Sequence, residues 1–291
     1  MKKSLMRSCL YSLLLLLMMV SGSAVSQAQN ADPGDTGTQT LAVEQVSETR
    51  PIKTIGIIGG VSWASSIEYY RIMNELARDR LGGASSAQIL MYSIEFGEFS
   101  EQERLADKGD WTLMTQTIVD AGQRLQRGGA DFIVIASNTL NSLADTVEQE
   151  SGLPVLHIAD ATREAVREKG LHKVALLGTT YTMEQPFYRD RLKEYGIDVV
   201  IPDEQERDYI NTVIFDELCA NEVRDESKEG FKKIIDRLQR EEGAEGVILG
   251  CTEIPLLIKQ EDVSIPVFDT TAIHSEAAVD YSLSDLEGFE R

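Results

Sequence analysis

The segment GVILGCTEIPLLI (246–258) ends an apolar strand pattern at Cys251, and Thr252 and Glu253 follow. A thiol at the point where a strand gives way to a helix lies near the positive end of the helix dipole and near free backbone N–H groups. Both effects lower a thiol pKa from its ordinary value of about 8.5. We therefore predict that Cys251 is a thiolate able to take a proton. Thr252 and Glu253 are expected to cap the helix that follows.

The segment IVIASNTLNSLAD (133–145) has the same form, with a hydroxyl where the other segment has a thiol. Its apolar run ends at Ser137, and Asn138 and Thr139 follow in a turn that can offer backbone and hydroxyl donors to a carboxylate. No activating histidine stands beside Ser137 in the sequence, so its hydroxyl is a much poorer base than a thiolate. We expect Ser137 to hand a proton to a substrate, directly or through water.

These two segments begin an internal repeat. IVIASNT…LPVLHIADATREAV lines up with GVILGCT…IPVFDTTAIHSEAAV, with 17 residues from Ser137 to Pro154 and 15 from Cys251 to Pro266. Two similar halves would place Ser137 and Cys251 at mirrored strand ends, where ligands of parallel sheets bind. An acid or base on each face of the substrate, with donors for its carboxylate, is what a two-base racemase needs. The alternative is the general self-similarity of α/β proteins.

The elements that would position these residues alternate along the chain. Eight short apolar runs are typical of strands, at 54–60, 87–96, 131–137, 154–159, 173–179, 198–202, 246–250 and 266–270. Helical patterns lie between them, among them 66–81, 111–128, 183–196 and 229–243, with Gly128, Gly196 and Gly243 as C-terminal signals. Near-continuous apolar strands suit burial on both faces. We predict an α/β fold of two similar domains with parallel sheets, related by a pseudo-two-fold axis, with the active site in the cleft between them.

The predicted domains are residues 52–159, completed by the C-terminal helix 271–284, and residues 160–270. Residues 1–28 have a basic start, an apolar run of about a dozen residues and a small-residue end, the pattern of a secretory signal peptide. The apolar run is shorter than the roughly 20 residues that span a bilayer, and a retained anchor is the alternative. Residues 29–51 would form a flexible leader. We expect export to a periplasm.

Charge and residue usage exclude several classes of function. The formal net charge is −20, which repels nucleic acid and anionic lipid. The expected partner is a small molecule, with no nucleic acid and, after signal cleavage, no membrane. His157, His172 and His274 lack the spacing of a zinc site, so no metal is expected. Cys219 falls in a helical apolar pattern, and we expect it to be buried in a helix.

The segment TIGIIGGVSWASS (54–66) is a glycine-rich loop between a predicted strand and a predicted helix. Its glycines are spaced G-x-x-G-G rather than G-x-G-x-x-G, so a dinucleotide site is the less favoured interpretation. A tight turn beneath a small anion fits better, with Ser62 as a donor to the substrate. Trp63 is expected to pack against the protein rather than to line the cleft.

Over nearly all of residues 54–284, the sequence resembles the cofactor-independent aspartate/glutamate racemase superfamily. The resemblance rests on IGIIGGVSW, the SNT turn, HIADAT, VALLGTTYTMEQPFYRDRL, IPDEQERDYINTVIFDELC and LGCTEIPLL. The branch that it resembles most is that of the L-aspartate/glutamate-specific racemases. The resemblance implies two α/β domains, an interdomain active site, an amino acid as substrate, no cofactor and often a homodimer.

The same resemblance assigns roles to individual residues. Cys251 matches the second catalytic cysteine, and Ser137 matches the first catalytic position, which is usually Cys and in the most similar branch Thr. Asn138, Thr139 and Thr252 match residues that hold the α-carboxylate of the substrate. The region around the other end of the substrate contains Thr179, Thr180, Tyr188 and Arg189.

The sequence departs from that branch after the Asn-Thr pair. The branch tends to have Met-His-Lys there, and this chain has Leu140-Asn141-Ser142. A lysine that could pair with an acidic side chain is missing, so specificity for aspartate or glutamate and a broader specificity both stay open. Two other functions stay open as well. One is a one-cysteine decarboxylase or isomerase of the same fold, and the other is a non-catalytic exported binder of amino acids.

Overall fold

The computed structural model describes residues 52–106 and 108–286. The predicted signal peptide (1–28) and leader (29–51) lie outside the described residues. In the part of the chain that is described, no helix combines the length and the apolar character needed to cross a membrane.

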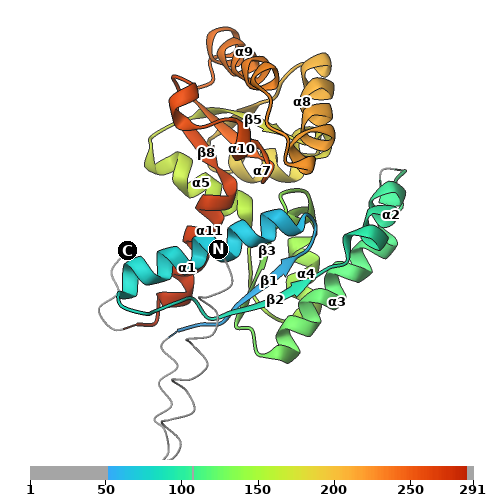
Figure 1. The fold of residues 1–291 in the computed structure, drawn as a ribbon, viewed down its shortest axis with the longest axis vertical. Coiled ribbons are helices and arrows are strands. Elements are labelled where there is room, and N and C mark those ends of the chain that lie inside the picture. Colours follow the sequence, from blue (N-terminus) through green and yellow to red (C-terminus); the bar gives the residue numbers. More distant parts are fainter. Residues whose placement is uncertain (1–51, 107, 287–291) are drawn as a thin grey trace, which may run out of the picture. The chain divides into compact units, whose positions relative to one another are not determined.

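Eight strands form two four-stranded sheets, and all pairings within the sheets are parallel (Figure 1). The first sheet has the order β2-β1-β3-β4, and the second has the order β6-β5-β7-β8. The strands are β1 (Ile55–Gly59), β2 (Ile89–Ser93), β3 (Phe132–Ile135), β4 (Val155–Leu156), β5 (Lys173–Gly178), β6 (Asp198–Val200), β7 (Gly246–Gly250) and β8 (Val267–Asp269). The order is the same in both sheets, so the predicted α/β fold with its internal repeat is confirmed.

Helices connect the strands of each sheet. They are α1 (Trp63–Leu81), α2 (Phe96–Ala106), α3 (Thr112–Gly128), α4 (Ala144–Ser151), α5 (Ile158–Glu168), α6 (Thr180–Glu184), α7 (Pro186–Lys193), α8 (Glu204–Asp216), α9 (Asp225–Glu242), α10 (Ile254–Leu257) and α11 (Thr270–Leu283). Short 3₁₀ turns are η1 (Thr139–Leu143), η2 (Leu218–Ala220) and η3 (Gln260–Asp262).

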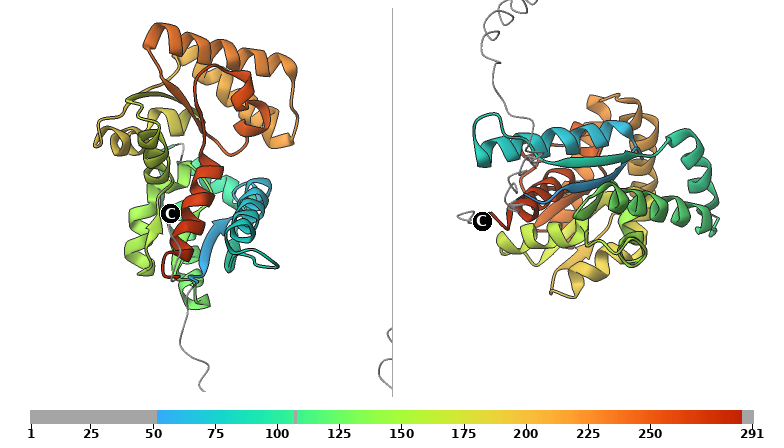
Figure 2. Two further views of the ribbon diagram at one scale, coloured as in Figure 1. Left: turned by 90° about the vertical axis from the view of Figure 1, so that its left-hand side faces the viewer. Right: turned by 90° about the horizontal axis from the view of Figure 1, so that it is seen from below.

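Successive residues of the central strands face opposite layers of the first sheet, as the period of a strand requires. Ile57 and Val134 are fully buried against α1 and α11, which lie side by side (Figure 2). Ile58 and Ile135 face the other way and pack with side chains of α2, α3 and α4. The first sheet is therefore covered on both faces, which explains its continuous apolar strands.

The second sheet is built in the same way. Leu176 and Ile248 pack against α5 and α7, and Leu177 and Leu249 pack against α8, α9 and α10. Helix α11, which follows β8 of the second sheet, contributes its side chains to the core of the first sheet. The domain boundaries stated above stay a prediction.

Several predicted element ends differ from the structure, and three of them have a local reason. Strand β4 ends at Leu156, because His157 caps α5 by accepting a hydrogen bond from the Ala159 backbone N–H (3.0 Å). The helix predicted over 183–196 is interrupted, because Pro186 cannot continue α6 and instead starts α7. Helix α3 includes Gly128, and the left-handed cap is the next glycine, at 129 (φ 92°).

Candidate active site

Residues that follow β1, β3, β5 and β7 line a single cavity of about 100 Å³, called the inner pocket below. Seven of the ten predicted site residues lie on its wall: Ser62, Ser137, Asn138, Thr139, Thr179, Cys251 and Thr252. The carboxyl ends of the two central strands of each sheet thus lie at the pocket. The structure brings Ser137 and Cys251 together at mirrored strand ends, as the repeat predicts.

The glycine-rich turn after β1 shapes one wall of the inner pocket. Gly60 has φ 91°, and a side chain there would come within 2.2 Å of the Ile94 carbonyl oxygen. Ser62 also has a positive φ, 68°, which is a strained conformation for a residue other than glycine. The hydroxyls of Ser65 and Ser66 hold this turn by donating to the Ser62 carbonyl oxygen, at 3.0 and 3.2 Å. The Ser62 hydroxyl itself accepts a hydrogen bond from the Ser65 backbone N–H (3.4 Å), and Ser62 lines the pocket.

The thiol of Cys251 is hydrogen-bonded to a carboxylate. Cys251 Sγ lies 3.0 Å from Glu253 Oε2, and the Thr252 hydroxyl donates to the same oxygen at 2.6 Å. Glu253 is only 7% exposed. Burial, followed by the charge of Glu253, raises the pKa of the Cys251 thiol well above its ordinary value. The predicted thiolate is therefore wrong for the resting site.

The local backbone explains this correction. Helix α10 is a single turn of four residues, too short to give an appreciable dipole at Cys251. The carboxylate of Glu253 does not cap that helix but turns back to the thiol and to Thr252. The predicted capping role of Thr252 and Glu253 is wrong, because both side chains are engaged with each other.

Ser137 has a different environment. Its Oγ accepts a long hydrogen bond from the Leu140 backbone N–H (3.4 Å), and Asn141 Nδ2 donates to its carbonyl oxygen (2.7 Å). Among the described residues, no carboxylate or imidazole is hydrogen-bonded to the Ser137 hydroxyl. The two strand ends therefore differ in kind: the thiol has a built-in proton acceptor, and the hydroxyl keeps its proton available for donation.

Asn138 is 5% exposed, and its amide orientation is fixed by its neighbours. The Thr270 hydroxyl donates to the Leu249 carbonyl oxygen (2.8 Å), so Thr270 Oγ1 must accept the 3.0 Å hydrogen bond from Asn138 Nδ2. Asn138 Oδ1 is buried without a hydrogen-bond partner in the described part of the chain. The atom that Asn138 leaves unsatisfied is thus an acceptor, which suits an ammonium group better than the predicted carboxylate.

The threonines on the opposite side form a small network. The hydroxyls of Thr139 and Thr182 lie 3.2 Å apart, and the Thr179 hydroxyl donates to Thr182 Oγ1 at 3.1 Å. Thr180 donates its backbone N–H to Asn211 Oδ1 (3.0 Å). Thr180 lines not the inner pocket but a second, larger cavity that shares Thr139 and Thr179 with it.

Two predicted substrate-binding residues lie elsewhere. Tyr188 is fully buried in the core beneath α7, where its hydroxyl donates to Thr162 Oγ1 (3.0 Å), and burial raises its pKa. Arg189 donates to the Glu184 carbonyl oxygen (2.8 Å). Neither residue lines either of the two cavities. The structure therefore does not bring Tyr188 and Arg189 together with the other predicted site residues.

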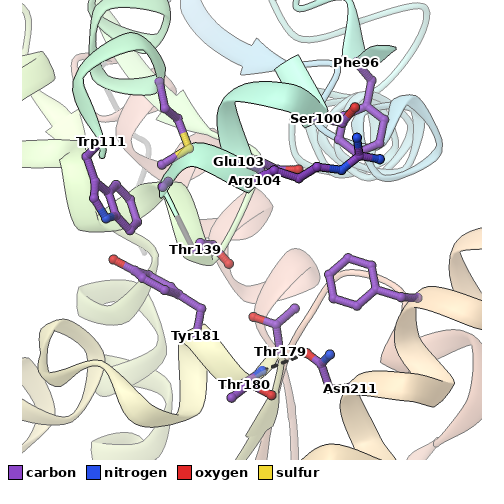
Figure 3. Close-up of a pocket in the computed structure, with 13 residues that line it drawn as sticks. Phe96, Ser100, Glu103, Arg104, Trp111, Thr139, Thr179, Thr180, Tyr181 and Asn211 are labelled. Carbon is purple, nitrogen blue, oxygen red and sulfur yellow. Dashed lines mark hydrogen bonds between the residues drawn. The ribbon is translucent and has the colours of Figure 1, made fainter. Parts of the chain in front are cut away.

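The larger cavity, called the outer cavity below, has a volume of about 540 Å³ (Figure 3). It is continuous with the inner pocket through shared wall residues, including Phe96, Glu103 and Phe215. Trp111 and Tyr181 lie on one side of it (Figure 3). Their ring centroids are 4.9 Å apart. These residues come from four different helices or turns, so no local pattern in the sequence identifies them together.

Cys219 is a second thiol on the wall of the inner pocket. The expectation that it is buried in a helix is wrong: α8 ends at Asp216, and Cys219 lies exposed in the turn η2. The residue as a whole is exposed, but partial burial of its sulfur, with the charges of Glu253 and Glu103, raises the pKa of its thiol to about 12. The expectation that Trp63 packs against the protein is also wrong. Its side chain is 70% exposed, and it does not line the pocket.

No group of three or more His, Cys, Asp or Glu side chains among the described residues could hold a metal ion.

The family model for Asp/Glu/hydantoin racemase matches residues 58–278 of the chain. A solved structure of a candidate Asp/Glu racemase from Yersinia pestis is 45% identical, with a TM-score of 0.74, and the match covers 80% of this chain and 100% of that one.

Two further relatives agree with this match. The structure of an aspartate racemase homologue from Pyrococcus horikoshii OT3 is 37% identical, with a TM-score of 0.70, over 79% of this chain and 99% of that one. The broad specificity amino-acid racemase RacX of Bacillus subtilis is 22% identical over 229 residues, covering 77% of this chain and 96% of RacX. The chain therefore belongs to the Asp/Glu/hydantoin racemase family and is an isomerase of the amino-acid racemase class.

Proposed function

We propose that the protein racemises free α-amino acids by two-base proton transfer, with Cys251 and Ser137 on opposite faces of the α-carbon. The single observation that supports this most is the inner pocket, where both residues follow equivalent strands of the two sheets. A volume of about 100 Å³ suits the α-carbon with its carboxylate and ammonium groups and leaves the side chain to extend outward.

The polar groups of the inner pocket can orient such a substrate. Ser62 and Thr139 line the pocket, and in this proposal their hydroxyls donate to the α-carboxylate. The unpartnered Asn138 Oδ1 accepts from the α-ammonium group, which satisfies a buried acceptor that otherwise costs stability. The Thr252 hydroxyl is committed to Glu253, so its contribution to the carboxylate comes from the backbone.

Glu253 supplies the proton acceptor that a thiol of raised pKa requires. Glu253 takes the proton from Cys251 Sγ, and the resulting thiolate removes the α-proton. The Ser137 hydroxyl donates its proton to the opposite face of the carbanion. Glu253 then returns its proton, through water, to the Ser137 oxygen. Each turnover ends with a thiol, a hydroxyl and a carboxylate, as it began, and the reverse direction runs through the same steps.

The experiment that tests this function follows α-deuterium by NMR and configuration by chiral chromatography, with single amino acids in D₂O under reductant. We expect exchange with inversion, lost in Cys251→Ala and in Ser137→Ala. Absence of exchange with every amino acid would contradict the proposal.

A second candidate is a one-cysteine enzyme, such as a decarboxylase that protonates one face of a planar enediolate. The bonding of Ser137 favours it, because no described base activates that hydroxyl. In the same assay this enzyme would exchange the α-proton with retention of configuration, or release CO₂ from a substituted malonate without racemising any amino acid.

We also propose, from the residue pattern of 1–28 and from the family, that the protein is exported to a periplasm and acts as a homodimer. Trp63, Ile67 and Tyr70 support the dimer, since they recur on one face of α1 and are each more than half exposed. Analytical ultracentrifugation of the wild type and of Trp63→Glu tests the dimer. Mass spectrometry of the N-terminus in a periplasmic fraction tests the export and its cleavage site.

A further inference from the structure

The outer cavity is the place where a substrate side chain must lie if the α-carbon occupies the inner pocket. Phe96, Glu103, Thr139, Thr179 and Phe215 line both cavities, so the two cavities adjoin, and their shared wall is called the passage below. A volume of about 540 Å³ lies within the 300–1,000 Å³ typical of pockets for drug-sized ligands. The one- or two-carbon side chain of aspartate or glutamate would leave most of this space unfilled.

Five large apolar or aromatic side chains contribute to the wall of the outer cavity, beside polar residues such as Asn211. Phe96, Trp111, Met114, Tyr181 and Phe215 all contribute to it (Figure 3). Phe96 and Phe215 are 42% and 54% exposed, so apolar surface at the passage faces solvent. A bulky side chain placed there removes this surface from water, whereas a carboxylate would have to give up its hydration against it.

The charges on the walls also disfavour an acidic side chain. Glu103 lies at the passage, and the inner pocket adds Glu253. The one cationic residue on the described wall of either cavity is Arg104, whose guanidinium already pairs with Glu101 (2.5 Å). A second carboxylate near the inner pocket would meet the negative charge of Glu253, and a cationic or neutral group would not.

The segment that replaces Met-His-Lys supplies no cation either. Leu140 is buried in the core of the first sheet. Asn141 is 1% exposed and is fully used by the backbone, since it donates to the carbonyls of Ile135 and Ser137 and accepts from Ile158 N–H. Ser142 lines a different cavity.

We propose that the preferred substrates are amino acids with a large, non-acidic side chain (aromatic, long aliphatic or basic), held in the outer cavity between its aromatic residues. This inference rests on the proposed racemase function and names its substrate class. Trp111 and Phe215 act as specificity residues for the side chain.

The first test compares kcat/KM for L-phenylalanine, L-methionine, L-lysine and L-arginine with that for L-aspartate and L-glutamate. We expect values about 10-fold or more higher for the large non-acidic substrates. Higher values for aspartate or glutamate overturn the inference and leave the racemase function standing. Absence of racemisation with every amino acid overturns the racemase function, and this inference with it.

Variants locate the effect in the outer cavity. Trp111→Ala and Phe215→Ala should each lower kcat/KM for phenylalanine more than for alanine, whose side chain does not reach the cavity. Leu113→Ala is the matched control, since Leu113 is exposed on α3 beside the cavity but does not line it. An equal loss for both substrates overturns the assignment. Arg104→Ala should leave the ratio of phenylalanine to glutamate turnover unchanged. A selective loss of glutamate turnover, which raises that ratio, indicates an acid-binding cavity instead.

A binding measurement keeps the test independent of turnover. The sequence has two tryptophans, so Trp111 is the one that remains in a Trp63→Phe protein. We expect D-phenylalanine to change its fluorescence at lower concentration than D-glutamate. A response to glutamate at lower concentration than to phenylalanine contradicts the inference.

Discussion

Cys251 Sγ lies 3.0 Å from Glu253 Oε2, and Glu253 is almost completely shielded from solvent. This contact gives the catalytic thiol a fixed proton acceptor and, at the same time, a negative charge that opposes thiolate formation. In the proposed mechanism, the thiolate is therefore formed by transfer to Glu253 during turnover rather than kept in the resting protein. The two consequences of one carboxylate can be separated by experiment.

Glu253→Gln should lower kcat roughly 100-fold or more, because the acceptor for the thiol proton is lost. Removing the charge should also lower the pKa of Cys251, so its alkylation by iodoacetamide should become faster at pH 8. Racemisation and alkylation rates, measured side by side, are thus expected to move in opposite directions. If both rise together, Glu253 acts only through its charge.

Ser137→Ala should lower racemisation roughly 100-fold or more, because the proton for the opposite face is lost. Exchange of the α-proton with retention of configuration should persist through Cys251. Ser137→Cys serves as the matched variant, and it should restore or increase racemisation because a thiol is the better acid and base. Complete loss of exchange in Ser137→Ala, with native stability, would argue that Ser137 does more than return a proton.

Tyr188→Phe should leave kcat/KM unchanged and lower the free energy of unfolding by about 1 kcal/mol, the usual value of one lost buried hydrogen bond. The reason is that the Tyr188 hydroxyl bonds Thr162 in the core. Urea unfolding and steady-state kinetics on the same preparation check both parts. A clear rise of KM would place Tyr188 at the substrate after all.

Acid should destabilise the protein through two buried histidines. Burial lowers the pKa of His157 to about 3, with Arg191 adding to the effect, and burial lowers that of His274 to about 4. Both values lie below the unfolded value near 6.5, so the unfolded state binds these protons first. Stability from the two groups is complete above that pH and falls as the pH decreases. Between pH 7 and 5 the loss is roughly 4 kcal/mol.

The contacts of these histidines support the same expectation. His157 Nδ1 accepts from Ala159 N–H, and His274 bridges the Tyr69 hydroxyl and the Leu156 carbonyl oxygen. His157→Asn keeps a capping acceptor without a titrating group, so it should remove about 1.4 kcal/mol per pH unit from the slope below pH 6. Urea unfolding at several pH values measures that slope, and an unchanged slope in the variant would exclude His157 as a source.

The fold could be predicted because the sequence pattern of each strand and helix lies within a short stretch of the chain. Strands such as β1 and β7 are buried on both faces, so each is an unbroken apolar run, and the two halves repeat the same sequence of runs. The ends were less well predicted where one side chain decides them. Pro186 divides a helix that its apolar spacing makes continuous, and the cap at His157 ends β4 early.

The site could be predicted where it follows strand ends and not where it depends on side-chain direction. Ser137 and Cys251 could be identified because each stands at the end of a predicted strand. The sequence does not show that Glu253 turns back toward Cys251 instead of capping α10. Nor does it show that Phe96 and Tyr181 meet in one cavity, since they are 85 positions apart and lie in different halves.

The placement of α5 and α11 has a consequence for how the chain folds. These helices occupy matching places in the repeat, but α5 follows the first sheet and packs on the second, whereas α11 follows the second sheet and packs on the first. The two halves thus exchange the equivalent helices α5 and α11, as the subunits of a domain-swapped dimer do, but within one chain. The core of each half therefore includes a helix that follows the other sheet in the chain. A fragment cut between the halves lacks part of its core, so the two halves should fold and unfold together.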